Sequence, residues 1–305
     1  MIIQKEEAKE ILMKGGNVVI PTETVYGLAG SIHYPQAIKQ IYTLKKRPQE
    51  NPLILHAATL PQILDLVEGV RPSFFLLADH FWPGPLTLIL EAKKGTDPLI
   101  TAGLSTVGVR IPNHLSTLSL LEETGPLAAP SANLSGKPSS TQPSHIEKDF
   151  GSHFPILEGP PPLHGLESTI LGWLQGSWQI LRYGSLVKGA VEEVLHERLL
   201  ESSLPICPGK RFKHYSPEAT LFCTKGRLNE AEAIIGYENR HYPSSLPVYS
   251  LGRDDSPTSI AHNLFATFRQ IDQEGLTTVW LDMDLPKEGL YATILERMKR
   301  AMQLE

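Results

Sequence analysis

The stretch KKRPQENPLILHA, residues 45–57, joins a predicted helix to a predicted strand and carries three cations at the junction. Pro48 disfavours the α region for the residue before it, so the helical pattern of residues 35–45 has to end here. The run PLILHA is typical of a buried strand. Because residues i and i+2 share one side of an extended backbone, we expect Lys45 and Arg47 to point the same way.

The alternation of helices and strands continues on both sides of this stretch. Helical spacing of apolar residues predicts helices at residues 6–14, 35–45, 60–68, 73–81, 115–124 and 186–199. Short apolar runs predict strands at residues 17–21, 52–57, 86–92, 106–112, 126–130, 168–174 and 178–184. We interpret PTETVYGLAG, residues 21–30, as a turn-rich loop after the first strand. The pattern predicts an α/β domain built on one large twisted sheet.

The chain changes character after residue 200. A length of 305 residues exceeds what one core usually holds, so two domains are expected. Residues 201–217 are proline-rich, basic and without period, as in a linker. Beyond them, strands are predicted at 220–224, 246–251 and 277–283, and helices at 228–236, 259–274 and 289–303. We therefore divide the chain into a domain at 1–200, a linker at 201–217 and a small parallel-sheet domain at 218–305.

Composition excludes several classes of protein. The net charge of -5 argues against a protein that holds nucleic acid through bulk charge, although a local basic cleft is compatible with it. The charged N-terminus argues against a secretory signal, and the longest apolar patch is too short to span a bilayer. The two cysteines, Cys207 and Cys223, form no C-x-x-C pair. We therefore expect a cytoplasmic protein with neither a disulfide framework nor a zinc ribbon.

Polar residues recur at i, i+2 spacing in segments that are not helical. Lys45 with Arg47 offers a point charge and a planar fork, a good match for phosphate oxygens. Thr22 with Thr24, and Ser131 with Asn133, could present hydroxyls and an amide to a ligand. The nucleotide signatures G-x-x-x-x-G-K-[ST] and G-x-G-x-x-G are absent, as are H-E-x-x-H and G-x-S-x-G.

Each of these residues also has a structural interpretation. Lys45 and Arg47 are compatible with solvated surface charge, and His56 with a satisfied core histidine. Arg110 lies inside the apolar run TVGVRIP, where an unpaired charge is costly, so a structural ion pair and an anion ligand both stay open. Capped turns, strand positions and surface charge would account for Ser131, Asn133, Ser168, Thr169 and Arg182.

The order of the motifs is more specific than any one of them. PTETVYGL, K-x-R-P-x-x-N-P-L-I-x-H, WPGPLT, TVGVRIP, APSAN, ESTI and PGKRFKHYSP follow one another between residues 10 and 217. In this order the chain resembles the Sua5/YrdC family of threonylcarbamoyl-AMP synthases, in its two-domain Sua5 form. The resemblance implies a YrdC-like domain with a large twisted mixed sheet, and a small C-terminal Rossmann-like domain with a parallel sheet.

The resemblance also implies an activity. The family makes threonylcarbamoyl-AMP from L-threonine, bicarbonate and ATP and releases pyrophosphate. A partner system then transfers the group to adenosine 37 of tRNA, forming t6A. The cations of residues 45–47 would offset the mutual repulsion of these anionic substrates. As a mechanism, the threonine amine first captures bicarbonate or CO2, and the resulting carbamate then attacks the α-phosphorus of ATP. Mg²⁺ is expected to arrive on the phosphates of ATP.

Site residues follow motif by motif. The resemblance assigns ATP contacts to Lys45, Arg47, Asn51, Thr106, Ser131, Asn133, Thr141, Arg182 and Phe212. It assigns L-threonine contacts to Thr24, His56, Arg110 and Ser168. Lys45, Arg47, Ser131 and Asn133 are expected at the reacting centre. The linker is expected to cover the cavity, although Phe212 lacks the hydroxyl that the family often has there.

Two other functions compete with this one. A carbamoyltransferase that forms carbamoyl-adenylate also uses a YrdC-like domain, but such proteins carry zinc-finger segments that two isolated cysteines cannot supply. A module that binds tRNA or double-stranded RNA is the rival without catalysis, and the net acidity of the chain argues against it. Contact with tRNA, and with the machinery that transfers the group, is an expectation from the family; contact with a membrane is not expected.

Overall fold

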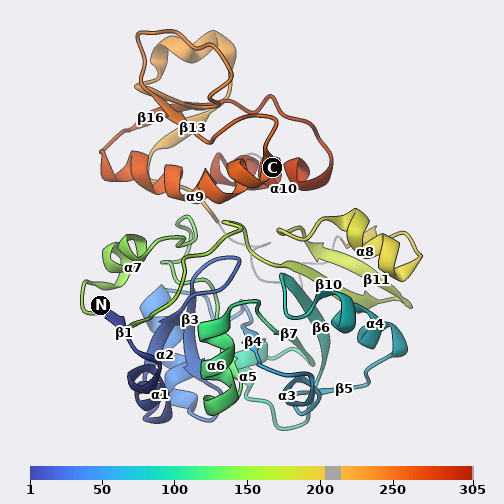
Figure 1. Ribbon diagram of the computed structural model, residues 1–305. Coiled ribbons are helices and arrows are strands. Elements are labelled where there is room, and N and C mark those ends of the chain that lie inside the picture. The colour runs from blue at the N-terminus through green and yellow to red at the C-terminus, as the bar shows by residue number, and fades with distance from the viewer. Residues whose placement is uncertain (203–213, 304–305) are drawn as a thin grey trace.

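The computed structural model describes residues 1–202 and 214–303 and divides their strands between two sheets (Figure 1). The larger sheet has twelve strands among these residues, in the order β1-β9-β2-β3-β8-β4-β7-β6-β10-β11-β12, with β5 paired to β6. These strands are β1 (Ile2–Ile3), β2 (Asn17–Ile20), β3 (Gly27–Ser31), β4 (Ile54–His56), β5 (Val67–Glu68), β6 (Leu86–Ala92), β7 (Thr106–Arg110), β8 (Leu127–Ala128), β9 (Ile156–Leu157), β10 (Thr169–Leu174), β11 (Ser177–Arg182) and β12 (Leu200–Glu201). Parallel and antiparallel pairs are mixed, as the sequence predicted.

Helices cover both faces of this sheet, because its central strands are apolar on both sides. In β2, Val18 and Ile20 pack into one apolar cluster and Val19 into another. The helices of this unit are α1 (Lys5–Met13), α2 (Pro35–Lys45), α3 (Leu60–Leu64), α4 (Pro72–Phe81), α5 (Pro98–Thr101), α6 (Leu115–Thr124), α7 (Pro143–Phe150) and α8 (Lys188–Leu195). Helices α1 and α6 contribute to the cluster of Val18, and α2 and α4 to that of Val19.

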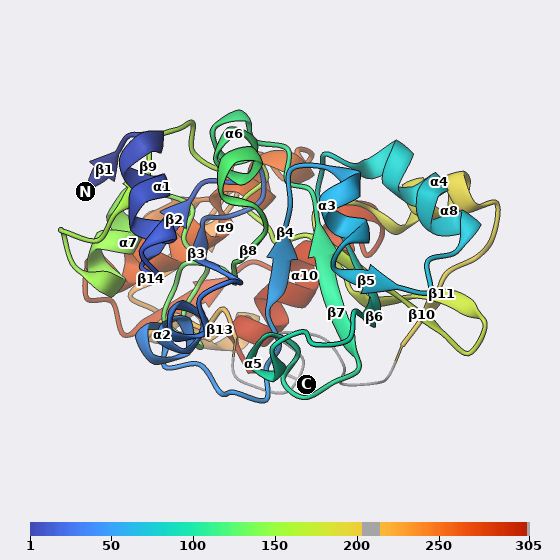
Figure 2. The same cartoon turned by 90° about the horizontal axis from the view of Figure 1, so that it is seen from below.

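The second sheet is small and fully parallel. Its strands, β13 (Thr220–Phe222), β14 (Ala233–Gly236), β15 (Val248–Ser250) and β16 (Thr278–Leu281), pair in the order β13-β16-β14-β15. Helices α9 (Pro257–Gln273) and α10 (Gly289–Ala301) lie on the side of this sheet that faces the larger unit (Figure 1). Seen from below in Figure 2, both helices lie behind the larger sheet. The α/β class with a large mixed sheet and a small parallel sheet is confirmed.

Several local predictions are wrong for identifiable reasons. The helix predicted at 228–236 is a short 3₁₀ turn at Lys225–Glu230 followed by strand β14, because Ile234 and Ile235 are needed in the core on opposite faces of the sheet. The loop predicted at 21–30 ends in strand β3, and the helix predicted at 60–68 ends at Leu64, before β5. Helix α7 was missed.

None of the helices in the described residues is long and apolar enough to cross a membrane.

Candidate active site

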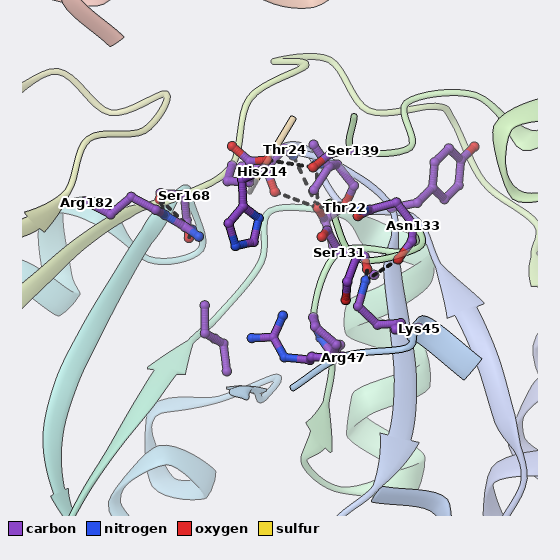
Figure 3. A pocket seen from close by; sticks show the side chains of 18 of the residues that line it. Thr22, Thr24, Lys45, Arg47, Ser131, Asn133, Ser139, Ser168, Arg182 and His214 are labelled. Carbon is purple, nitrogen blue, oxygen red and sulfur yellow. Dashed lines mark hydrogen bonds between the residues drawn. The ribbon is translucent and has the colours of Figure 1, made fainter. Parts of the chain in front are cut away.

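One cavity collects side chains from many of the predicted motifs (Figure 3). The cavity wall is formed by the loop after β2, the end of α2, strands β4 and β7, the loop after β8, the segment before β10, the end of β11 and residues 214–215. The predicted site residues that line it are Thr24, Lys45, Arg47, His56, Arg110, Ser131, Asn133, Ser168 and Arg182. Residues more than a hundred positions apart therefore form one surface.

Lys45 and Arg47 both reach the cavity, but not through an extended backbone. Lys45 is the last residue of α2, and Lys46 then adopts the left-handed conformation at φ 50° and ψ 41°. The predicted i, i+2 geometry is therefore wrong, although the two cations do lie in one wall. The Lys45 ammonium donates hydrogen bonds to the backbone oxygens of Ser131 and Asn133. Burial, followed by the charge of Arg47, holds the pKa of Lys45 well below its usual value.

Arg47 and Arg182 present guanidinium groups to the cavity from different sides (Figure 3). Arg47 donates to the carbonyl oxygens of Asn51 and Pro52 at 3.0 and 2.8 Å. Arg182 donates to the Ser168 carbonyl oxygen from Nε at 3.2 Å and from Nη2 at 2.9 Å. Removal from water lowers the pKa of Arg47 to about 10. Neither guanidinium forms an ion pair within the described residues, so both retain charge for an anionic ligand.

Arg110 combines the two roles that the sequence left open. Its Nη2 lies 2.6 Å from the Glu23 carboxylate, so a buried structural ion pair is present. Nε donates to the Gly84 carbonyl oxygen at 3.1 Å and Nη1 to the Thr24 hydroxyl at 3.0 Å. The same guanidinium lines the cavity. Thr22 and Thr24 are joined through their hydroxyls at 2.8 Å, which confirms that they share one side.

The S-x-N segment forms a turn against the ammonium of Lys45. The Asn133 amide nitrogen donates to the carbonyl oxygens of Leu134 and Lys137 at 2.8 and 3.0 Å, whereas its Oδ1 is buried without a hydrogen-bond partner among the described residues. Ser168, on the opposite side, shares a hydrogen bond of 2.7 Å with the Thr87 hydroxyl. Asn133 Oδ1 is thus an acceptor that a ligand could satisfy.

Two histidines in the cavity wall are neutral near pH 7. Burial, and then the charge of Arg110, lowers the pKa of His56 to about 3. Burial, and then the charge of Arg47, lowers the pKa of His214 to about 3. Nε2 of His214 is buried and has no hydrogen-bond partner in the described part of the chain. Figure 3 shows its ring between the Arg182 and Ser131 sides of the cavity. A neutral ring adds no charge to the cations around it.

Other predicted site residues lie elsewhere. Asn51 is buried behind the wall, where its carbonyl oxygen accepts from Arg47. Thr106 lines a separate small pocket with Leu104 and Gly108. The Thr141 hydroxyl is buried with no hydrogen-bond partner among the described residues, but Thr141 is not part of the cavity lining. Phe212 and the other residues of 203–213 lie outside the described residues, whereas His214 and Tyr215 of the predicted cover at 201–217 line the cavity.

The structure adds residues that the motifs did not single out. Ser139 and Glu167 line the cavity and are joined by a hydrogen bond of 2.6 Å. Lys137 also lines it, as does Tyr215, which belongs to the predicted cover at 201–217. Glu167 directly precedes Ser168 in the ESTI motif, so its position in the sequence was a usable signal. Among the described lining residues Glu167 carries the only carboxylate, which leaves the cavity strongly cationic.

The arrangement suits the binding of a polyanion beside a smaller polar ligand. One part of the cavity is lined by the cations Lys45, Arg47 and Arg182. Another part is lined by Thr24, His56 and Arg110, where the charge of Arg110 is offset by Glu23. Preorganised cations can stabilise charge that moves during phosphoryl or adenylyl transfer. Among the described residues no cluster of three or more His, Cys, Asp or Glu side chains is placed to hold a metal ion.

Comparison with known proteins agrees with this geometry. Residues 10–184 match the family model described as "Telomere recombination" and named for Sua5, YciO and YrdC. Residues 186–302 match the model described as "Threonylcarbamoyl-AMP synthase, C-terminal domain". The threonylcarbamoyl-AMP synthase of Bacillus subtilis is 34% identical, with 98% of this chain and 92% of the relative aligned. That of Pyrococcus abyssi is 33% identical over 96% of this chain and 92% of its own length. The crystal structure of P. abyssi Sua5 complexed with L-threonine superimposes with a TM-score of 0.90 at 31% identity, covering 99% of this chain and 98% of that one.

Proposed function

The chain belongs to the Sua5/YrdC family of threonylcarbamoyl-AMP synthases, and from that premise we propose that its cavity joins L-threonine, bicarbonate and ATP into threonylcarbamoyl-AMP. The enzyme is a nucleotidyltransferase that releases pyrophosphate and makes the precursor of tRNA t6A. The observation that carries the proposal is the group of three cations, Lys45, Arg47 and Arg182, that line one cavity without a carboxylate partner among the described residues.

The two substrates would occupy different parts of the wall. ATP would place its phosphates among Lys45, Arg47 and Arg182, and Asn133 Oδ1 would accept from a donor of a bound substrate. Threonine would lie against Thr24 and His56, with its carboxylate at the N–H groups of Arg110 that Glu23 and Thr24 leave free. The P. abyssi structure with L-threonine supports a threonine site in a relative of the same fold.

The reaction requires positions rather than a side-chain nucleophile. The threonine ammonium first loses a proton, and the neutral amine then attacks the carbon of bicarbonate; water leaves with the former hydroxyl oxygen, and an N-carboxylate forms. An oxygen of this carbamate then attacks the α-phosphorus, and the bond from that phosphorus to the β-bridging oxygen breaks. Pyrophosphate leaves with the electron pair. The cations would stabilise the charge that accumulates on the leaving group.

Mg²⁺ would enter with ATP as part of the substrate. The lining residues are cations, hydroxyls and amides, and the Glu167 carboxylate is already engaged by Arg297 and Ser139. Phosphate oxygens and water would therefore supply most of its ligands. We further propose that the product is consumed by a tRNA-modifying transferase in the cytoplasm, because a mixed anhydride hydrolyses readily and has to be passed on.

The deciding experiment follows pyrophosphate release by the purified full-length chain. Release should require ATP, L-threonine and bicarbonate together, and labelled bicarbonate should appear in an adenylate. Release that does not depend on threonine would contradict the proposal and favour a carbamoyl-adenylate reaction instead. If no combination of substrates supports release, binding of labelled tRNA would test the remaining rival.

A further inference from the structure

One arginine of helix α10 in the second unit, Arg297, packs against the larger unit. Arg297 is 1% exposed, and its Nε donates to Glu167 Oε2 at 3.1 Å. Its Nη2 donates to the Tyr183 carbonyl oxygen at 2.6 Å, and its guanidinium lies 4.8 Å from the centre of the Tyr215 ring. Glu167 and Tyr215 both line the substrate cavity, whereas Arg297 does not. Arg297 therefore contacts the cavity wall from behind.

Glu167 is the residue through which this contact reaches the substrates. It is 6% exposed, and its second oxygen, Oε1, accepts from the Ser139 hydroxyl at 2.6 Å. Burial opposes ionisation of Glu167, but Arg297 and then Arg182 hold its pKa below the usual value. The carboxylate is therefore charged, and both of its oxygens are engaged away from the cavity cations.

Arg182 is the alternative partner for that carboxylate. It belongs to the cavity, and it is anchored to Ser168, the residue next to Glu167, at 2.9 Å. Its charge already acts on Glu167, so the two groups are close enough to interact. If Arg297 were absent, Arg182 would be a cavity cation held at the residue next to that carboxylate, and a pairing between them would withdraw the Arg182 guanidinium from an anionic ligand.

The packing around Glu167 keeps the two units in register at this point. Leu166 is fully buried in the apolar cluster of the second unit, among residues of α9 and α10. Gly165, at φ 72°, lies so close to α9 that a Cβ would approach the Ala261 carbonyl oxygen to 2.4 Å. The Thr293 hydroxyl donates to the Gly184 carbonyl oxygen at 3.2 Å. The segment before β10 is thus held by both helices.

A second arginine, Arg269 of α9, serves as the comparison. It pairs with the buried Asp149 carboxylate at 2.7 Å and donates from Nη2 to the Pro138 carbonyl oxygen at 2.6 Å. Asp149 in turn accepts from the Leu134 amide at 3.2 Å, next to Asn133. Arg269 therefore anchors the same wall from another side without contacting Glu167.

We propose that Arg297 is a positioning residue for the nucleotide site, which holds the Glu167 carboxylate on the side of the second unit and so leaves Arg182 free for the phosphates of ATP. The inference rests on the proposed function for its substrate. It gives the second unit a defined task, since the cavity would carry one cation fewer without it.

The test compares Arg297→Met with the double variant Arg297→Met/Glu167→Gln. We expect the single variant to raise KM for ATP at least tenfold, with kcat and KM for threonine changed less than threefold. Removal of the freed carboxylate should then restore most of the ATP affinity in the double variant. Lys299→Met, exposed on the same helix, is the matched control and should behave as the wild type.

Arg269→Met tests whether the effect is specific to Glu167. Its loss should destabilise the fold, and addition of Glu167→Gln should not rescue it. The inference is overturned if Arg297→Met leaves KM for ATP unchanged, if the double variant is no better than the single one, or if Glu167→Gln rescues both arginine variants equally. Calorimetric binding of a non-hydrolysable ATP analogue measures the same contrast without turnover, so it distinguishes failure of this inference from failure of the proposed reaction.

Discussion

The cations of the cavity and the arginines of the contact between the two units differ in burial and in bonding: Arg47 and Arg182 are half-buried, whereas Arg269 and Arg297 are buried. Lys45, Arg47 and Arg182 bond to backbone carbonyl oxygens and form no ion pair among the described residues. Arg269 pairs with Asp149 at 2.7 Å, and Arg297 pairs with Glu167 at 3.1 Å and also with Glu296. Because an unpaired charge away from water is costly, the first group is suited to an incoming anion and the second to holding structure.

Arg110 shows that position alone does not separate the two groups. It lines the cavity with the first group, yet its ion pair with Glu23 at 2.6 Å gives it the partner of the second. Its field toward a ligand is therefore weaker than that of Arg47. The difference fits a cavity that takes a polyanion on one side and a single carboxylate on the other.

Replacing Arg47 should break the comparison most strongly. We expect Arg47→Met to lower kcat/KM for ATP by about a thousandfold, or about 4 kcal/mol, because a preorganised cation is lost from the phosphate side. The free energy of unfolding should fall by about 1 to 2 kcal/mol, less than for a broken buried ion pair, because only two hydrogen bonds to carbonyl oxygens are removed. Steady-state kinetics and urea unfolding measure the two effects. Lys46→Gln removes a neighbouring exposed charge and should change neither; a large loss of stability in Arg47→Met would place it with the structural group instead.

Replacing Glu23 should show whether Arg110 stabilises the fold as well as lining the cavity. Glu23→Gln leaves a buried guanidinium without its counter-charge, so we expect the free energy of unfolding to fall by about 3 kcal/mol. Threonine binding should respond more than ATP binding. Chemical unfolding gives the first quantity and calorimetric titration of each substrate the second. An unchanged free energy of unfolding would mean that the ion pair between Arg110 and Glu23 is not formed in solution. A larger effect on ATP binding than on threonine binding would mean that Arg110 contacts ATP rather than threonine.

Pattern and motif predicted much of the fold, but not the strand at 233–236. Pro48 and the apolar spacing before it predicted α2, which ends at Lys45. Strand β14 was predicted as part of a helix because Ala and Glu before it favour helix, whereas its place between β15 and β16 is decided by tertiary packing. A local pattern carries no information on which neighbours a strand will have.

The candidate site divides in the same way. The cations and hydroxyls of the cavity were predicted from the order of the family's motifs, because residue type alone left a structural interpretation open for each of them. Glu23 and Glu167 were missed although they lie in the motifs PTETVYGL and ESTI, because the role of a carboxylate in a cationic site depends on its distance to Arg110 or Arg297. The backbone conformation of Lys46 could not be predicted either. Pro48 predicts where the helix ends but not the left-handed residue that ends it.

The smallest predicted effect is on the pH dependence of stability and concerns His145, a buried histidine close to Arg269. Burial, and then the charge of Arg269, lowers the pKa of His145 to about 3, below the value of about 6.5 expected in the unfolded chain. Between pH 3 and pH 6.5, His145 is protonated in the unfolded state but not in the folded state. The free energy of unfolding therefore falls as the pH decreases from 6.5 toward 3. At pH 5 this amounts to about 2 kcal/mol relative to pH 7.5. His145→Gln should remove that share of the acid sensitivity, whereas the exposed His153→Gln should not, as urea unfolding at both pH values would show. An equal decline in all three proteins would mean that His145 takes up a proton as readily in the folded as in the unfolded chain, so that neither its burial nor the charge of Arg269 lowers its pKa.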